Sequence, residues 1–194
     1  MEQTIRANKH FRTIDLTYIA IGAALIAVCS WISIPMSVPF TLQTFAVFFL
    51  LMLLGGKRGT CAVLVYILLG AAGVPVFSGF SSGIGVLLGS TGGYILGFLL
   101  TGLIYLGCTK LFGEKLPVML TALVLGLAVC YTFGTAWFLV VYNRANDAIG
   151  IGKALSWCVI PFLIPDLVKM ALACLLANRI KPFLSKSGIA ADTH

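Results

Sequence analysis

Two opposite charges stand one helical turn apart in an apolar stretch near the end of this chain. Asp166 and Lys169 lie within residues 160–177 of a 194-residue sequence whose mean hydropathy is +1.06. A charge at the centre of a bilayer costs roughly 2.5–3.5 kcal/mol on insertion scales, and an opposite charge three residues away on a helix offsets part of that cost. The pair is therefore either a structural ion pair inside a helix bundle or a polar site for a ligand that enters from one side of a membrane.

The composition is that of an integral membrane protein. Hydrophobic residues make up 60% of the chain and charged residues 10%, which leaves no separate soluble domain, so we expect a single transmembrane domain over residues 1–194. The apolar runs do not alternate in polarity as outer-membrane strands do. We therefore predict an all-α bundle of six transmembrane helices, of which the second and third are short. The six apolar segments are residues 14–34, 41–54, 59–72, 92–112, 117–142 and 165–182.

Basic residues are sorted between alternate loops. Ten of the thirteen lysines and arginines precede the first segment, lie at the end of the last segment or after it, or lie at residues 57–58 and 110–115, whereas Arg144 and Lys153 lie in loops on the other side. The positive-inside rule then predicts cytoplasmic termini, with tails at residues 1–13 and 183–194. The net charge of +7 thus reflects membrane topology, and we expect no nucleic-acid partner.

The usual residues of catalysis and metal binding are missing from the apolar segments. Both histidines, His10 and His194, lie in the tails, and the six cysteines stand singly without metal-ligand spacing. The Gly-Lys pairs at residues 56–57 and 152–153 lack the upstream glycine of a phosphate-binding loop. We therefore expect no enzyme, no metal, no cofactor and no ATP hydrolysis by this chain.

Three segments on the expected outer side carry polar groups toward one place. Thr41, Gln43 and Thr44 follow the helix-stopping prolines at residues 35 and 39, and they either cap a helix or contact a ligand. Residues 74–98 contain seven glycines and five serine or threonine side chains, and they form either a flexible external loop or a loop folded inward to line a cavity. Proline favours the first turn of a helix, so we predict that Pro165 begins the last span and that Asp166 and Lys169 lie in its outer turns. These segments then enclose one vestibule.

A stripe of small residues lies within the first apolar segment. Ala20 and Ala24, like Ala23 and Ala27, have the four-residue spacing that lets helix backbones approach closely in lipid. The stripe serves either packing inside the bundle or docking of a helix from another subunit.

Several motifs together resemble the biotin-specific S component of energy-coupling-factor (ECF) transporters. They are VPFTLQTFA at residues 38–46, GVPVF at 73–77, GIGVLLG at 83–89, TGGY at 91–94 and PFLIPDLVK at 161–169. The likeness extends over nearly the whole chain, and the motifs follow the family's order. Two residues depart from the family pattern: Ser90, where proline is frequent, and Pro165, where glycine commonly precedes the aspartate.

The resemblance implies a multi-pass protein of a prokaryotic plasma membrane, whose helices contact lipid. This protein would capture biotin outside the cell. It would dock, through the alanine stripe, on a transmembrane coupling subunit driven by two ATPase subunits. Biotin would be the transported ligand, with Asp166 accepting a ureido N–H and Lys169 donating to the ureido carbonyl or to the carboxylate. The other expected contacts are Gln43, Thr41, Phe40, Ser78, Gly83, Gly85, Tyr94, Tyr142 and Trp157. The alternative is a stand-alone secondary transporter of a small vitamin-like solute, although the chain lacks broken helices in two matching halves.

Overall fold

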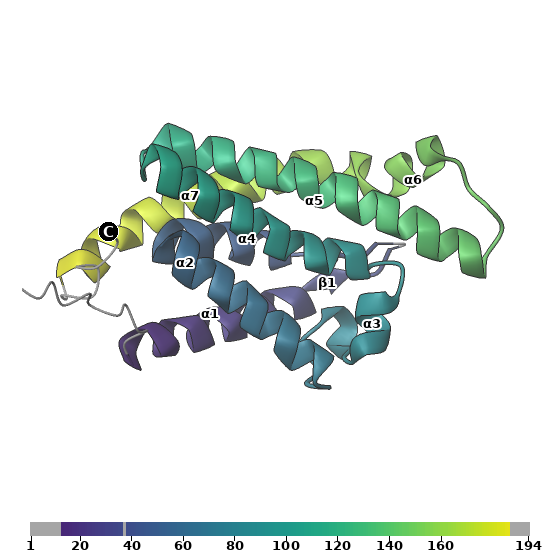
Figure 1. Cartoon of the computed structure of the whole chain (residues 1–194), viewed down its shortest axis with the longest axis horizontal. Helices are drawn as coiled ribbons and strands as arrows, with labels where there is room; N and C mark the ends of the chain where they lie inside the picture. The colour runs from purple at the N-terminus through teal and green to yellow at the C-terminus, as the bar shows by residue number, and fades with distance from the viewer. Residues whose placement is uncertain (1–12, 37, 187–194) are drawn as a thin grey trace, which may run out of the picture.

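The computed structural model describes residues 13–36 and 38–186, which form a bundle of long helices (Figure 1). In this part of the chain, five stretches are long and apolar enough to cross a membrane, so the expected all-helical, multi-pass architecture is confirmed. The long helices are α1 (Thr13–Trp31), α2 (Gln43–Ala71), α4 (Gly92–Phe112), α5 (Leu116–Ala145) and α7 (Ile160–Lys186). The short elements are β1 (Ser33–Ile34), β2 (Phe40–Thr41), η1 (Ser78–Phe80), α3 (Ile84–Leu88) and α6 (Ile151–Cys158).

The two ends of the described chain lie at the same end of the bundle, whereas α3 and α6 lie at the opposite end (Figure 1). The last helix continues to Lys186, so it includes the first residues of the tail expected from residue 183. Residues 1–12 and 187–194, which hold most of the two expected tails and both histidines, lie outside the described residues.

The helix α2 reverses direction at Gly55. This residue has φ 79° and ψ 169°, a backbone conformation that glycine adopts readily and other residues do not. The Gln43 side-chain amide donates a hydrogen bond to the Tyr66 hydroxyl at 3.1 Å, whereas a straight helix would separate these residues by about 35 Å. Residues 43–54 and 56–71 are therefore two antiparallel limbs, which correspond to the second and third apolar segments. Together they pack against α1, α4 and α7.

Small residues bring α4 and α5 into close contact. A β-carbon added to Gly97 would lie 2.7 Å from the Cys130 sulfur, and one added to Gly134 would lie 2.3 Å from the Tyr94 ring. The Thr101 hydroxyl donates across this interface to the carbonyl of Gly126 at 3.0 Å. Close backbone approach and hydrogen bonds between helices are how helices associate in lipid, where hydrophobic burial adds little.

The prediction that Pro165 begins the last span is wrong. The helix α7 begins at Ile160, after a break at Val159, and Pro165 lies inside it. Pro161 occupies the first turn instead, where a missing N–H has no cost. An interior proline is tolerated in a bundle that supplies other partners for the freed carbonyl. Asp166 and Lys169 therefore lie in the second and third turns of α7.

The glycine-rich segment is ordered and only partly folded inward. It forms η1 and α3, and it is held to α2 by a hydrogen bond from the N–H of Gly83 to the carbonyl of Gly70 at 2.7 Å. Val86 lines the central cavity described below. Ile84 and Leu88, at the two ends of α3, are each 61% exposed.

The alanine stripe of α1 is divided between two faces. Ala23 and Ala27 are buried, and the neighbouring Gly22 lies so close to α2 that an added β-carbon would be 3.0 Å from the β-carbon of Ala62. Ala20 and Ala24 are exposed on the outer face of α1. Half of the stripe therefore packs inside the bundle, and the other half remains available to another helix.

Candidate ligand-binding site

The ammonium group of Lys169 is fully occupied by partners inside the protein. Its Nζ lies 2.8 Å from Oδ1 of Asp166, so the two charges share a helix face as predicted. It also donates to the backbone carbonyl of Thr41 at 2.7 Å and to the Thr44 hydroxyl at 3.1 Å. The ammonium group also lies over the face of the Phe40 ring, with 4.1 Å between Nζ and the ring centroid. An ammonium has three N–H donors, and each of them has an acceptor here.

Both carboxylate oxygens of Asp166 also accept hydrogen bonds within the protein. Its Oδ1 accepts a hydrogen bond from the Thr44 hydroxyl at 2.9 Å, and its Oδ2 accepts one from the Tyr131 hydroxyl at 2.7 Å. Asp166 and Lys169 are 1% and 6% exposed, and a buried charge is tolerated only when it is paired and hydrogen-bonded. We refer to Asp166, Lys169, Thr44 and Tyr131 as the charged cluster. It joins α2, α5 and α7 and has no net charge.

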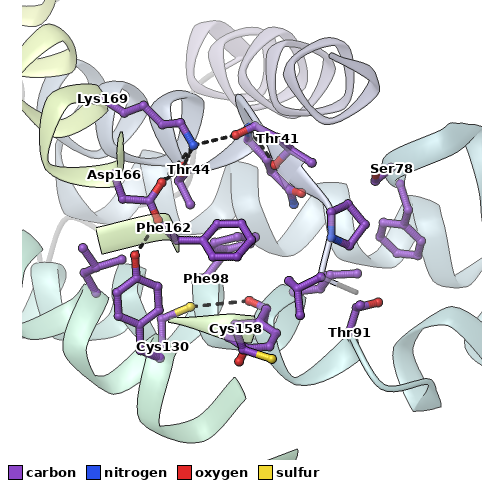
Figure 2. A pocket seen from close by; sticks show the side chains of 18 of the residues that line it. Thr41, Thr44, Ser78, Thr91, Phe98, Cys130, Cys158, Phe162, Asp166 and Lys169 are labelled. Carbon is purple, nitrogen blue, oxygen red and sulfur yellow. Dashed lines mark hydrogen bonds and ion pairs between the residues drawn. The ribbon is translucent and has the colours of Figure 1, made fainter. Parts of the chain in front are cut away.

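A cavity of about 210 Å³ opens beside the charged cluster. A space of this size can hold a small molecule. In Figure 2 Asp166 and Lys169 lie at the upper left, Phe98 and Phe162 lie in the middle with Cys130 and Cys158 below them, and Ser78 and Thr91 lie on the right. The lining residues are Val38, Pro39, Thr41, Gln43, Thr44, Phe77, Ser78, Ser81, Val86, Thr91, Tyr94, Ile95, Phe98, Leu127, Cys130, Tyr131, Cys158, Phe162, Asp166 and Lys169.

Six of the residues expected from the sequence line this cavity. They are Thr41, Gln43, Ser78, Tyr94, Asp166 and Lys169, and they come from β2, α2, η1, α4 and α7. Separate segments therefore do meet in one place. Phe40 contacts the Lys169 ammonium group but does not line the cavity.

The other expected residues lie away from the cavity. Gly83 precedes α3, and Gly85 lies within it. Tyr142 and Trp157 pack edge to face, with 6.1 Å between their ring centroids, and Tyr142 borders a separate polar groove with Arg144, Asp147 and Lys153. The structure does not bring these four residues to the charged cluster.

Sequence reasoning missed the contribution of α5 and α6. Tyr131 bonds directly to Asp166, and Cys130 and Cys158 form part of the cavity wall. A hydroxyl in the middle of an apolar span is a signal that could have identified Tyr131, because a polar side chain at that depth needs a partner. The two cysteines carry no such signal. Among the described residues, no group of histidine, cysteine or carboxylate side chains is arranged to hold a metal ion.

Known proteins resemble this chain over most of its length. It matches the BioY family over residues 2–186. It is 44% identical to the "Biotin transporter BioY" of Thermotoga maritima over 162 residues, which are 83% of this chain and 92% of that protein. It is 39% identical to the "Probable biotin transporter BioY" of Pyrococcus horikoshii over 169 residues, which are 86% of this chain and 96% of that protein.

A solved structure shares the fold. The chain resembles the crystal structure, at 2.1 Å, of the S-component for biotin from an ECF-type ABC transporter, with a TM-score of 0.73 and 28% sequence identity. The match covers 87% of this chain and 90% of that one. These relatives are named as transporters and not as enzymes, and the resemblance inferred from the sequence motifs is confirmed. The chain belongs to the BioY family.

Proposed function

We propose that this chain is the biotin-binding S component of an ECF-type transporter and that it captures biotin outside the cell. One observation carries the proposal: a buried charged cluster with no net charge lies beside an apolar cavity of small-molecule size. Relatives named as biotin transporters and a solved biotin S-component support it. No observation favours a stand-alone secondary transporter.

The ureido ring of biotin fits the charged cluster better than its carboxylate does. The cluster neutralises itself, so it offers no excess positive charge to an anion. The ureido ring is neutral and carries both N–H donors and a carbonyl acceptor, which suit Asp166 and Lys169 respectively. The apolar rings then occupy the middle of the cavity, and the carboxylate lies toward the Ser78 and Thr91 hydroxyls, which are drawn opposite the charged cluster in Figure 2.

The proposed membrane topology has six crossings and cytoplasmic termini. The two limbs of α2 count as separate crossings, joined by the reversal at Gly55. The basic residues of this reversal support a cytoplasmic location, and one of them, Arg58, pairs with Asp15 at the start of α1 at 2.6 Å. The ligand cavity then opens at the outer face of the plasma membrane, in a single domain over residues 1–194.

Uptake requires partners under this proposal. The chain docks on a transmembrane coupling subunit that works with two ATPase subunits. The exposed Ala20 and Ala24 provide the close-packing face on α1, while the buried Ala23 and Ala27 support that helix from inside.

A titration of radiolabelled biotin against the detergent-solubilised chain tests the site. Asp166→Asn and Lys169→Ala each leave the other charge buried and unpaired, and truncation of one partner of such a pair costs about 2–5 kcal/mol. We expect each variant to bind biotin at least about thirtyfold more weakly.

Asp147→Asn and Lys153→Ala are matched controls, because both residues are exposed and border the separate groove. They should bind biotin like the unchanged chain. Size-exclusion profiles of all four variants separate loss of the site from loss of the fold. Unchanged affinity in both Asp166→Asn and Lys169→Ala contradicts the proposal.

A further inference from the structure

Two basic residues on the expected outer side of the membrane border the same polar groove. Arg144 lies in the last turn of α5, and Lys153 lies in the first turn of α6. Both are exposed, and with Asp147 they line an open groove of about 620 Å³. Outer loops of membrane proteins are generally poor in lysine and arginine. Two such residues at one groove therefore call for a local explanation.

Positive charge exceeds negative charge in the polar groove. Arg144 and Lys153 carry two positive charges and Asp147 carries one negative charge, which leaves a net charge of +1. Among residues 13–36 and 38–186, Asp147 forms no ion pair with either of them. The ammonium of Lys153 lies over the Trp157 ring instead, with 4.9 Å between Nζ and the ring centroid. A guanidinium and an ammonium with one excess positive charge suit a singly charged phosphate diester.

The turn between α5 and α6 holds the two sides of the groove together. The side-chain amide of Asn143 donates to the carbonyl of Ile149 at 3.2 Å, and its oxygen accepts from the N–H of Ile149 at 3.0 Å. Trp157 of α6 packs edge to face against Tyr142 of α5, with 6.1 Å between the ring centroids. These contacts fix the ends of the two helices relative to each other, so the groove exists before a ligand binds.

The length of α5 places the polar groove at the level of the lipid headgroups. This helix has 30 residues, so it is about 45 Å long. The hydrocarbon core of a bilayer is about 30 Å thick, and it is about 40–45 Å thick with the headgroup regions. The last turn of α5, which contains Arg144, therefore lies beyond the hydrocarbon core and among the headgroups.

The neighbouring helix α6 has apolar side chains that face away from the bundle. Ala154 and Cys158 are buried, whereas Ile151 and Leu155 are 67% and 39% exposed. The members of each pair are four residues apart, so one face of α6 packs on the bundle and another lies outside it. A short amphipathic helix that carries a tryptophan is typical of the boundary between headgroups and acyl chains. Acyl chains thus have an apolar surface next to the charged groove.

We propose that the polar groove binds the headgroup of an anionic phospholipid from the outer leaflet. Arg144 and Lys153 donate hydrogen bonds to the phosphate oxygens, and Asp147 accepts one from a headgroup hydroxyl, as phosphatidylglycerol would supply. The exposed face of α6 contacts an acyl chain of the same lipid. The choice of leaflet rests on the proposed topology, and the binding itself does not depend on biotin.

Native mass spectrometry of the delipidated, detergent-solubilised full chain tests the proposal. The chain should bind phosphatidylglycerol several-fold more tightly than phosphatidylcholine with the same acyl chains. A lysine or arginine at a membrane surface changes the binding of anionic lipid about fivefold. Arg144→Gln and Lys153→Gln should therefore each weaken phosphatidylglycerol binding about fivefold, and Asp147→Asn should strengthen it by about the same factor. Loss of folded protein would not produce opposite effects within one groove.

Lys110→Gln is the matched control, because Lys110 is also an exposed lysine on a helix but does not border the polar groove. It should bind phosphatidylglycerol like the unchanged chain. Equal losses in Lys110→Gln and Lys153→Gln, or unchanged binding in both Arg144→Gln and Lys153→Gln, overturn the proposal. So does equal binding of the two lipids by the unchanged chain.

A headgroup without acyl chains separates a lipid site from a site for a soluble phosphate ester. Glycerophosphoglycerol should bind far more weakly than phosphatidylglycerol, because it cannot contact the apolar face of α6. Equal affinities overturn the lipid assignment. All of these variants should keep their affinity for biotin, so a failure of lipid binding leaves the proposed function intact, and absence of biotin binding leaves the lipid site intact.

Discussion

At the scale of single residues, the charged cluster sets what the cavity can hold. Thr44 and Tyr131 each satisfy one side of the Asp166 carboxylate, and Thr41 and Thr44 satisfy Lys169. A site in which every charge already has protein partners is held in one geometry before a ligand enters.

Tyr131→Phe tests this view of the cluster. The change removes only the hydroxyl that holds Oδ2 of Asp166 at 2.7 Å. Hydrogen bonds to charged groups contribute about 1.5–3 kcal/mol, and we expect biotin to bind about tenfold more weakly because the carboxylate loses its orientation. Tyr142→Phe, outside the cavity, is the control and should have no effect. Equal affinity in the two variants would show that Tyr131 does not orient the site.

The sequence was sufficient to predict half of this site. Asp166 and Lys169 can be identified because two charges in an apolar helix are costly unless they have a role. Thr41 and Gln43 can be identified because they follow prolines. Tyr131, Cys130 and Cys158 are not predicted, since their place in the cavity depends on how α5 and α6 pack. Tyr142 and Trp157 have the right chemistry for a binding wall, but Tyr142 borders a different groove and Trp157 packs against it.

At the scale of elements, hydropathy predicted the spans well and their ends less well. The apolar segments match α1, both limbs of α2, α4, α5 and α7. The start of α7 differs from the prediction because two prolines four residues apart can each begin a helix, and only tertiary packing decides between them. The segment at residues 74–98, expected either as a flexible external loop or as a loop folded inward, is tied to α2 by backbone hydrogen bonds that no side-chain pattern reveals.

Gly55→Ala tests the reversal in α2. At φ 79° and ψ 169° an added β-carbon strains the backbone itself, which costs about 1–3 kcal/mol. It would not clash with a neighbour, because the nearest atom, Oε1 of Glu114, would lie 3.4 Å from the added carbon. We expect a lower melting temperature in detergent, with biotin protecting both proteins. Gly107→Ala is the control, because Gly107 is helical with open space around it. A melting temperature no lower than that of Gly107→Ala contradicts strain at Gly55.

At the scale of the whole molecule, the proposed docking assigns different roles to the two faces of α1. Ala24 is exposed, whereas Ala23 is buried against the bundle. We expect Ala24→Leu to keep its affinity for biotin in detergent and to lose most biotin uptake in cells that contain the coupling and ATPase subunits, because a larger side chain holds the partner helix away.

Ala23→Leu serves as the internal comparison for that surface. It forces extra atoms into a packed interface, which costs about 1–3 kcal/mol, so it should lower the melting temperature as well as uptake. If Ala24→Leu instead destabilises the solubilised chain, this face of α1 belongs to the bundle. If uptake is unchanged, the docking face lies elsewhere.

The saturated ammonium of Lys169 has one more consequence. A vitamin carbonyl can bond to it only by taking the place of an existing acceptor, and one of these acceptors is the backbone oxygen of Thr41 in β2. Binding at this lysine therefore exchanges one hydrogen-bond acceptor for another, because no N–H donor is free. If the vitamin takes the place of that oxygen, β2 loses one of its contacts with α7 when the vitamin binds, so the position of β2 reports whether the site is occupied.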